Sequence, residues 1–270
     1  MSDKITSLPP VSEMMRDAGL EPKKQFGQNF LFDLNLTRKI ARSVPDLENQ
    51  TVLEVGPGPG GLTRALLECG ARRVVAIEKD KTTAPILDRI AAASDGRLEV
   101  IYGDALKQFS EFMIQDSDYA VCSNLPYNIG TELLINWLHE ININSMTLMF
   151  QREVAQRIVA RVGDAQYGRL SVLASLVADA KILFNVPNTA FYPAPRVQSA
   201  VVQILPKQSR IGNKELKQVE QLTAKLFGQR RKMIRGIMPG ADWSRFGLAG
   251  TERAEDLFPE KFVELATIML

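Results

Sequence analysis

The stretch from Thr51 to Glu78 constrains the fold more than any other part of the sequence. Its pattern is strand, glycine-rich turn, helix and strand, predicted at residues 51–55, 56–61, 62–68 and 73–77. Gly70 lies just past the helix, where a C′ glycine ends a helix. This order forms one βαβ unit, which predicts a mostly parallel α/β sheet.

The turn and the acid that follows it indicate a nucleoside cofactor. Glycines let the backbone approach a ligand closely, and Glu78 lies about 20 residues further on, where an acid accepts hydrogen bonds from ribose hydroxyls. The glycine spacing is G-x-G-x-G, and Pro57 and Pro59 remove two backbone donors that a pyrophosphate needs. The loop therefore favours S-adenosylmethionine over NAD and disfavours a nicotinamide-dependent oxidoreductase.

Helices and strands continue to alternate up to Pro206. Further strands are predicted at 98–102, 119–122, 146–150, 180–186 and 199–205, and helices at 11–18, 34–43, 81–93, 130–139, 152–161 and 170–177. The rigid loop 191–196 joins the last two strands, which predicts an antiparallel edge on the parallel sheet. The fold class is therefore a Rossmann-like α/β sheet with helices on both faces.

Only helices are predicted after Pro206, at 213–227, 230–237, 243–246 and 259–269. We therefore expect a catalytic domain over residues 1–206, with an N-terminal extension at 1–20, and a small all-α domain over 207–270.

Polar residues follow two of the strands, at the edge where ligands bind in such sheets. Asp104 is a candidate acceptor for an adenine amine, although it can equally be a helix N-cap. Asn124 begins the turn Asn124-Leu125-Pro126-Tyr127. Its amide oxygen can accept from an amine, Pro126 fixes nearby carbonyls, and the Tyr127 ring can stack on a nucleobase. The alternative is an ordinary strand-to-helix turn.

Composition excludes several classes of protein. Cys69 and Cys122 give no disulfide framework, which suggests a reducing cytoplasm. The single histidine, His139, argues against a histidine-rich metal site and against Ser-His or Cys-His catalysis, and we expect it on a helix surface. No apolar run reaches the ~20 residues of a membrane span, and residues 1–10 lack the hydrophobic core of a secretion signal.

Basic residues are concentrated in one region, although the net charge of the chain is only +2. In residues 207–240, nine lysines and arginines stand against Glu215 and Glu220, so this segment carries +7 and the remainder −5. Such asymmetry favours a polyanionic partner. A solvated helical face is the alternative.

Together these motifs resemble the ribosomal RNA adenine N6,N6-dimethyltransferases, in particular the bacterial small-subunit enzymes. The resemblance runs from about Lys23 to the C-terminus. The matching segments are Phe26–Leu31, Glu54–Gly58, Ile77–Glu78, Gly103–Asp104, Asn124–Tyr127, Tyr167–Ser171, Phe191–Val201 and Gln229–Lys232. The set is highly specific, whereas any one segment alone is not.

The resemblance implies a site for each reactant. It places S-adenosylmethionine contacts at Asn29, Leu31, Gly56, Glu78, Asp104 and Asn124. It places the target adenine amine against Asn124, Leu125 and Pro126, with Tyr127 and Phe191 on the faces of the base. We expect RNA contacts at Lys23, Lys24, Arg230, Arg231 and Lys232.

The resemblance also implies the reaction, which is methyl transfer to the N6 amines of two adjacent adenines near the 3′ end of small-subunit ribosomal RNA. The partner is then a pre-ribosomal small subunit, and we expect a cytoplasmic, metal-free monomer. Two alternatives remain. One is a large-subunit adenine methyltransferase of the macrolide-resistance type. The other is a ribosome-assembly factor without activity, against which the intact glycine loop, Glu78 and Asn124 argue.

Overall fold

A seven-stranded sheet organises the protein, whose computed structural model describes residues 3–22, 28–108 and 118–267. The strand order is β4-β3-β2-β5-β6-β9-β7. The strands are β2 (Thr51–Val55), β3 (Arg73–Glu78), β4 (Leu98–Tyr102), β5 (Tyr119–Asn124), β6 (Ile143–Gln151), β7 (Ala178–Val186) and β9 (Ser199–Pro206). Strands β2 to β6 are parallel, and β9 is antiparallel to β6 and β7. The predicted Rossmann-like sheet with an antiparallel edge is confirmed.

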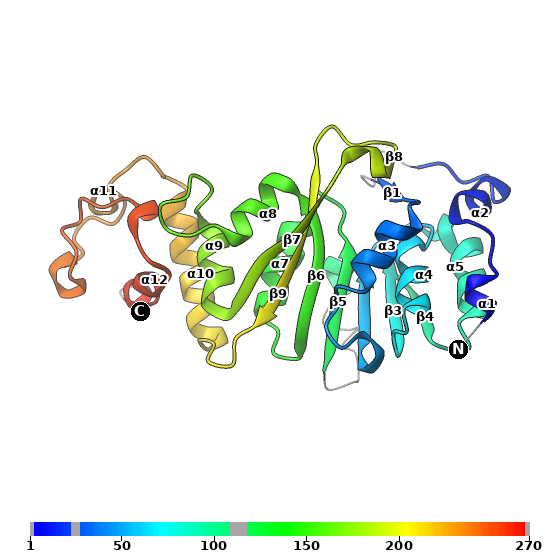
Figure 1. The fold of residues 1–270 in the computed structure, drawn as a ribbon. Helices are drawn as coiled ribbons and strands as arrows, with labels where there is room; N and C mark the ends of the chain where they lie inside the picture. Colours follow the sequence, from blue (N-terminus) through cyan, green and yellow to red (C-terminus); the bar gives the residue numbers. More distant parts are fainter. Residues whose placement is uncertain (1–2, 23–27, 109–117, 268–270) are drawn as a thin grey trace.

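Helices cover both faces of the sheet (Figure 1). One face packs against α3 (Leu34–Ala41), α4 (Gly61–Glu68) and α5 (Ala84–Ala93), and the other against α7 (Gly130–Leu138), α8 (Arg152–Val159) and α9 (Arg169–Val177). Successive residues of a strand point to opposite faces, so Val52 joins the first core while Leu53 joins the second. Burial on both faces explains why three of the four residues after Thr51 in β2 are apolar, with Glu54 as the exception.

A second, two-stranded sheet pairs β1 (Phe30–Leu31) with β8 (Phe191–Tyr192). The sequence predicted loops at both places, and this prediction was wrong, because each strand takes its hydrogen-bond partners from the other, which is distant in the sequence. Phe30 lies opposite Tyr192, and Leu31 lies opposite Phe191.

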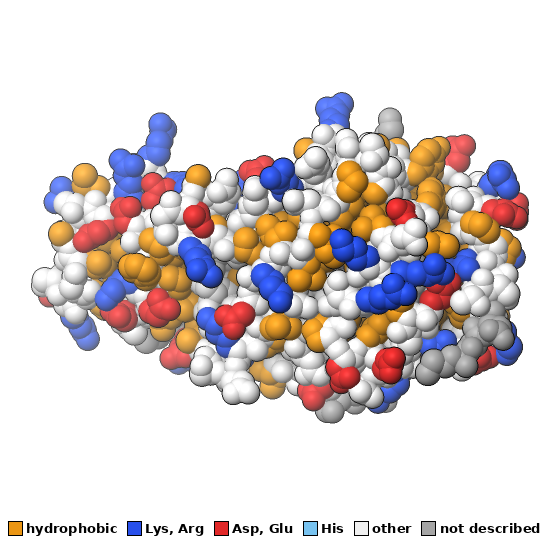
Figure 2. All heavy atoms as spheres, in the orientation of Figure 1, with side chains coloured by type: hydrophobic (Ala, Val, Ile, Leu, Met, Phe, Trp, Pro, Cys, Tyr) orange, Lys and Arg blue, Asp and Glu red, His pale blue; other side chains and the backbone are white. Residues whose placement is uncertain are grey.

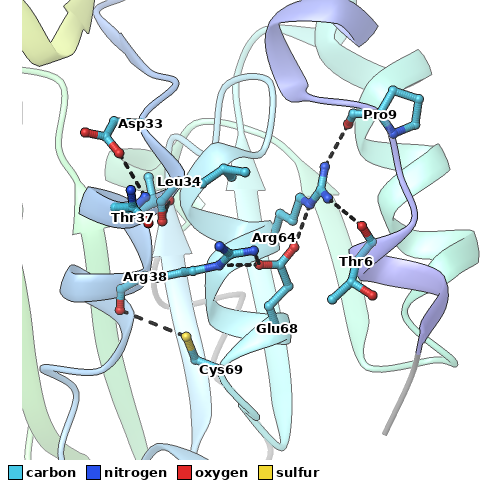
Figure 3. Close-up of polar contacts among 10 residues, drawn as sticks. Thr6, Pro9, Asp33, Leu34, Thr37, Arg38, Arg64, Glu68 and Cys69 are labelled. Atoms are coloured by element: carbon cyan, nitrogen blue, oxygen red, sulfur yellow. Dashed lines mark hydrogen bonds and ion pairs between the residues drawn. The ribbon is translucent and has the colours of Figure 1, made fainter.

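The N-terminal segment is held against α4 and α5 (Figure 3). It contains α1 (Asp3–Thr6) and α2 (Val11–Asp17). The buried Arg64 of α4 donates to the carbonyl oxygens of Pro9 at 2.7 Å and Thr6 at 3.2 Å. Its Nε also pairs with Glu68 Oε1 at 2.8 Å, and Arg38 pairs with Glu68 Oε2 at 2.8 Å. The segment is therefore tied to the helix that begins at the glycine turn.

The C-terminal helices extend from the β7 side of the molecule, at the end opposite the N-terminus (Figure 1). Outside this region, the short elements are α6 (Ala105–Gln108) and 3₁₀ turns at Leu47–Asn49, Lys81–Thr83 and Asn188–Ala190. The C-terminal helices are α10 (Asn213–Phe227), α11 (Ile234–Ile237) and α12 (Pro259–Ala266), with 3₁₀ turns at Trp243–Phe246 and Ala254–Asp256 between α11 and α12. Their apolar side chains join the core between the sheet and α9. The domain boundary at Pro206 stays a prediction.

The predicted helix over 230–237 was wrong in its first half. Lys232 N donates to the Gln229 carbonyl at 2.8 Å, and Ile234 N donates to the Glu252 carbonyl at 2.8 Å. These bonds hold residues 230–233 in a turn, so that α11 begins only at Ile234. None of the helices in the described ranges is long and apolar enough to span a bilayer.

Candidate active site

A cavity of about 250 Å³ opens at the carboxyl edge of the parallel strands. Its walls come from the residues that follow β2, β3, β4 and β5, together with β1. All six residues expected at the cofactor line it, namely Asn29, Leu31, Gly56, Glu78, Asp104 and Asn124. Leu125, Pro126 and Tyr127 line it as well. Residues from Gly56 to Tyr127 therefore share one site because β2, β3, β4 and β5 end at the same edge of the sheet, and β1 closes this site from a separate sheet.

The glycine turn is closely packed by β1. Gly58 has a φ of 56°, a left-handed conformation that favours glycine. A Cβ atom on Gly58 would lie 2.8 Å from Phe30 Cε1, and one on Gly61 would lie 2.5 Å from the Leu31 carbonyl oxygen. Glu78 Oε2 accepts a hydrogen bond from Gly58 N at 2.8 Å. Glycine is thus required for packing as well as for approach to a ligand.

Two buried carboxyl groups lie in the cavity wall. Burial raises the pKa of Glu78, although the backbone N–H groups of Asp80 and Gly58 oppose the rise. Glu54 is 2% exposed, and burial raises its pKa to about 8. A hydrogen bond from Thr63 Oγ1 at 2.6 Å acts in the opposite direction and lowers this pKa. Sequence reasoning gave Glu54 no role, although an acid inside an apolar strand is a signal for a buried polar site.

This donor and acceptor set fits S-adenosylmethionine. The cofactor carries a sulfonium, an ammonium and ribose hydroxyls, and the wall offers two carboxyl groups, Glu54 and Glu78. Pro57 and Pro59 also line the cavity and have no N–H to offer a phosphate. The wall therefore suits a cationic ligand better than a pyrophosphate.

Asp104 makes the capping contact that the sequence left as an alternative. Its Oδ1 accepts from Leu106 N at 3.1 Å, and its Oδ2 pairs with Lys79 Nζ at 2.8 Å. The hydrogen bond from Lys79 lowers the Asp104 pKa. Lys79 also lines the cavity and was not identified from the sequence. A contact between Asp104 and an adenine amine stays a prediction.

The Asn124 turn is fixed by contacts at both ends. Asn124 Nδ2 donates to the Asn29 carbonyl at 3.2 Å, and the Tyr127 hydroxyl lies 2.9 Å from Ser199 Oγ. Phe191, expected on a face of the target base, is buried beside β1 and is absent from the cavity wall. Its proposed stacking role stays a prediction.

The candidate RNA contacts differ in their surroundings. Lys23 and Lys24 lie outside the described residues. Arg230 pairs with Glu255 at 2.5 Å and donates to the Ala165 carbonyl at 2.9 Å. Arg231 and Lys232 are exposed. Figure 2 shows lysine and arginine side chains gathered at the upper left, where Figure 1 shows α11. Of these three, Arg231 and Lys232 are the better candidates to contact phosphate.

His139 is not simply a surface residue. It caps the C-terminus of α7, is about a quarter exposed, and its Nε2 lies 3.1 Å from Glu220 Oε2 on α10. Arg169 of α9 pairs with the same carboxylate at 2.9 Å. His139 therefore links α7 to α10 and is not among the residues that line the cavity.

Comparisons with known proteins identify the family. The model for "Ribosomal RNA adenine dimethylase" matches residues 19–269. A "Ribosomal RNA small subunit methyltransferase A" from Chelativorans is 52% identical over 97% of this chain and 98% of that relative, and one from Agrobacterium fabrum is 48% identical over 98% and 99%.

Solved structures show the same fold. A dimethyladenosine transferase from Plasmodium falciparum matches with a TM-score of 0.71 and 26% identity, over 87% of this chain and 95% of that one. The 23S rRNA methyltransferase ErmE matches with a TM-score of 0.66 and 24% identity, over 88% and 98%. The sequence matches extend over nearly the whole chain, and the chain belongs to the ribosomal RNA adenine dimethylase family.

Proposed function

We propose that this protein transfers methyl groups from S-adenosylmethionine to the N6 amines of two adjacent adenines near the 3′ end of small-subunit ribosomal RNA. The observation that carries the proposal is the position of the Asn124 turn beside a cavity with two buried carboxyl groups. The names of the small-subunit relatives support the choice of RNA. The likeness to ErmE concerns the fold alone and does not favour a large-subunit substrate.

Asn124 and Leu125 hold the two hydrogens of the target amine. Because Asn124 Nδ2 already donates to the Asn29 carbonyl, the amide is oriented with Oδ1 as the acceptor for substrate. The Pro126 carbonyl accepts from Ile129 N at 3.2 Å and Gly130 N at 3.1 Å, which engages both of its lone pairs. The second acceptor is therefore the Leu125 carbonyl, and not that of Pro126.

These two acceptors change the geometry of the target nitrogen and stabilise the charge that develops on it. When bound, S-adenosylmethionine supplies an electrophilic methyl group. An adenine amine is a poor nucleophile because its lone pair is delocalised into the ring. Two acceptors that grip its hydrogens favour a pyramidal nitrogen and stabilise the positive charge that develops there. No strong base is needed before attack, and positioning supplies most of the acceleration.

The Tyr127 ring compensates for the stacking that the target base loses when it leaves its helix. Base–aromatic stacking contributes about 1–3 kcal/mol per base. The contact between the Tyr127 hydroxyl and Ser199 Oγ fixes the ring before the base arrives, which lowers the entropy cost of stacking. Burial raises the Tyr127 pKa, so this hydroxyl stays neutral at physiological pH.

The substrate particle is a pre-ribosomal small subunit, bound in the cytoplasm by a monomer of this protein. The basic segment 207–240, within a separate C-terminal RNA-binding domain over 207–270, supplies phosphate contacts at the exposed Arg231 and Lys232. Methylation then accompanies maturation of the small subunit.

The test uses labelled S-adenosylmethionine with undermethylated small subunits, followed by mapping of the modified nucleotides. We expect label only on the two adjacent adenines. Asn124→Ala should bind cofactor but slow single-turnover transfer by about two to three decades, the cost of one lost transition-state acceptor. Asn144→Ala, an exposed asparagine at the start of β6, is the control. Label on large-subunit RNA, or a normal rate for Asn124→Ala, would contradict the proposal.

A further inference from the structure

Three aromatic rings form a row from the cavity to the surface. Phe30 lines the cavity. Its ring centroid lies 6.4 Å from that of Phe32, which lies 6.0 Å from that of Tyr192. The pairing of β1 with β8 places Phe30 directly opposite Tyr192, so both side chains project from the same face of the small sheet. The outer end of the row is open, because Tyr192 is 59% exposed.

The loop that follows Tyr192 is rigid and exposes apolar side chains. Pro193 and Pro195 restrict its backbone, and Asn188 Nδ2 donates to the Pro195 carbonyl at 3.4 Å. Val197 is 46% exposed and lies next to the exposed Arg196. The loop thus carries an exposed ring, Tyr192, and an exposed cation, Arg196, the two kinds of group that bind unpaired nucleotides, since every base has a π-face and every phosphate a negative charge.

We propose that Tyr192 stacks on the base adjacent to the target adenine and so positions the pair of adenines. This inference rests on the proposed function, in which the Asn124 turn receives the target. The two places are linked, because Asn124 contacts the carbonyl of Asn29 and the next residue, Phe30, pairs with Tyr192. A purine stacks over a larger area than a pyrimidine, so Tyr192 favours a target whose neighbour is a purine, as the second adenine is.

The first test separates binding from chemistry. Steady-state methyl transfer to undermethylated small subunits is measured for Tyr192→Ala and Tyr192→Phe. We expect Tyr192→Ala to raise the KM for the subunit about tenfold, within the range of base–aromatic stacking, with a smaller change in kcat. Tyr192→Phe, which keeps the ring, should restore the KM. The control is Ile141→Ala. Ile141 is 74% exposed and precedes β6, so it lies at the amino ends of the parallel strands, whereas the cavity lies at their carboxyl ends.

The second test asks whether Tyr192 contacts the neighbouring base itself. RNA hairpins carrying the two adenines are made with an abasic nucleotide on one or the other side of the target, and their affinities are measured. For wild type, one abasic hairpin should bind about tenfold more weakly than the intact one. For Tyr192→Ala, the same abasic change should cost nothing further, because the pair is already broken.

Equal losses for both proteins, or a KM unaltered in Tyr192→Ala, would overturn the role of Tyr192. Failure of wild type to methylate small subunits would overturn the proposed function instead. The two failures are distinguishable because the hairpin measurement depends on binding and not on methyl transfer.

Discussion

Glu54→Gln tests the electrostatics of the cavity through the stability of the protein. The carboxyl group is buried between β2 and α4, where burial raises its pKa to about 8 and the charge of Glu78 adds to the rise. The Thr63 hydroxyl, 2.6 Å away, opposes it. Glutamine has a similar volume and can keep an oxygen toward Thr63, so the substitution removes the ionisation with little change in packing.

The direction in which Glu54 changes stability with pH follows from its pKa values in the folded and unfolded states. The folded value, about 8, lies above the ordinary value of 4.5, so the folded state binds this proton more tightly. The stability that it contributes is complete below pH 4.5 and is lost as pH rises through about 8. At about 1.4 kcal/mol per pH unit, the loss for wild type reaches at most about 5 kcal/mol. Glu54→Gln has no group to ionise and does not lose this stability. Its free energy of unfolding should therefore exceed that of wild type by a few kcal/mol at pH 9 and be similar to that of wild type at pH 5.

Denaturant unfolding at pH 5, 7 and 9 without cofactor measures this difference. Glu132→Gln, which alters an exposed carboxyl group in the first turn of α7, serves as the control and should keep the wild-type pH dependence. Calorimetry in two buffers of different ionisation enthalpy adds a second measurement. Wild type should release more protons than Glu54→Gln on binding the cationic cofactor at pH 7, because only wild type carries the Glu54 carboxyl group, whose pKa is raised to about 8. A stability difference that is the same at all three pH values would refute the reasoning.

Three other substitutions test separate parts of the site. Glu78→Gln should weaken S-adenosylmethionine binding by about 1–3 kcal/mol in calorimetry, because ribose hydroxyls lose a charged acceptor; unchanged affinity would exclude that contact. Neutralising Arg231 and Lys232 should reduce the slope of log affinity for RNA against log salt concentration by about one unit per lost phosphate contact. An unaltered slope would show that these two residues are solvated and do not contact phosphate. Arg64→Met should lower the free energy of unfolding by about 1–3 kcal/mol, since the carbonyl oxygens of Thr6 and Pro9 lose a donor while Arg38 still pairs with Glu68; a smaller loss in denaturant unfolding would show that the N-terminal segment is held by its apolar contacts.

The sequence was most informative where structure is local. The predicted bounds of β2, β4 and α10 match those observed, because each is an apolar or amphipathic run that ends at a turn or breaker. The strand-tip positions of Glu78 and Asn124 were also predictable, since parallel strands bring their carboxyl ends to one edge.

Contacts between distant segments could not be read from such patterns. Residues 230–233 have helical propensity, yet Met233 forms a bridge with Arg253, and this pairing prevents a helix from starting there. The burial of Glu54 depends likewise on Thr63 and the helix that covers it. Neither outcome has a signal within a window of a few residues.

The short segment Asn29–Leu31 shows why the site cannot be divided into independent motifs. The Asn29 carbonyl orients the amide of Asn124, the Phe30 ring packs against Gly58 in the cofactor turn, and the Leu31 carbonyl packs against the start of α4. The same segment pairs with β8, about 160 residues away. A single extended segment thus contacts the cofactor turn, the target-base turn and the aromatic row, so a displacement of this segment would alter the sites of both substrates together.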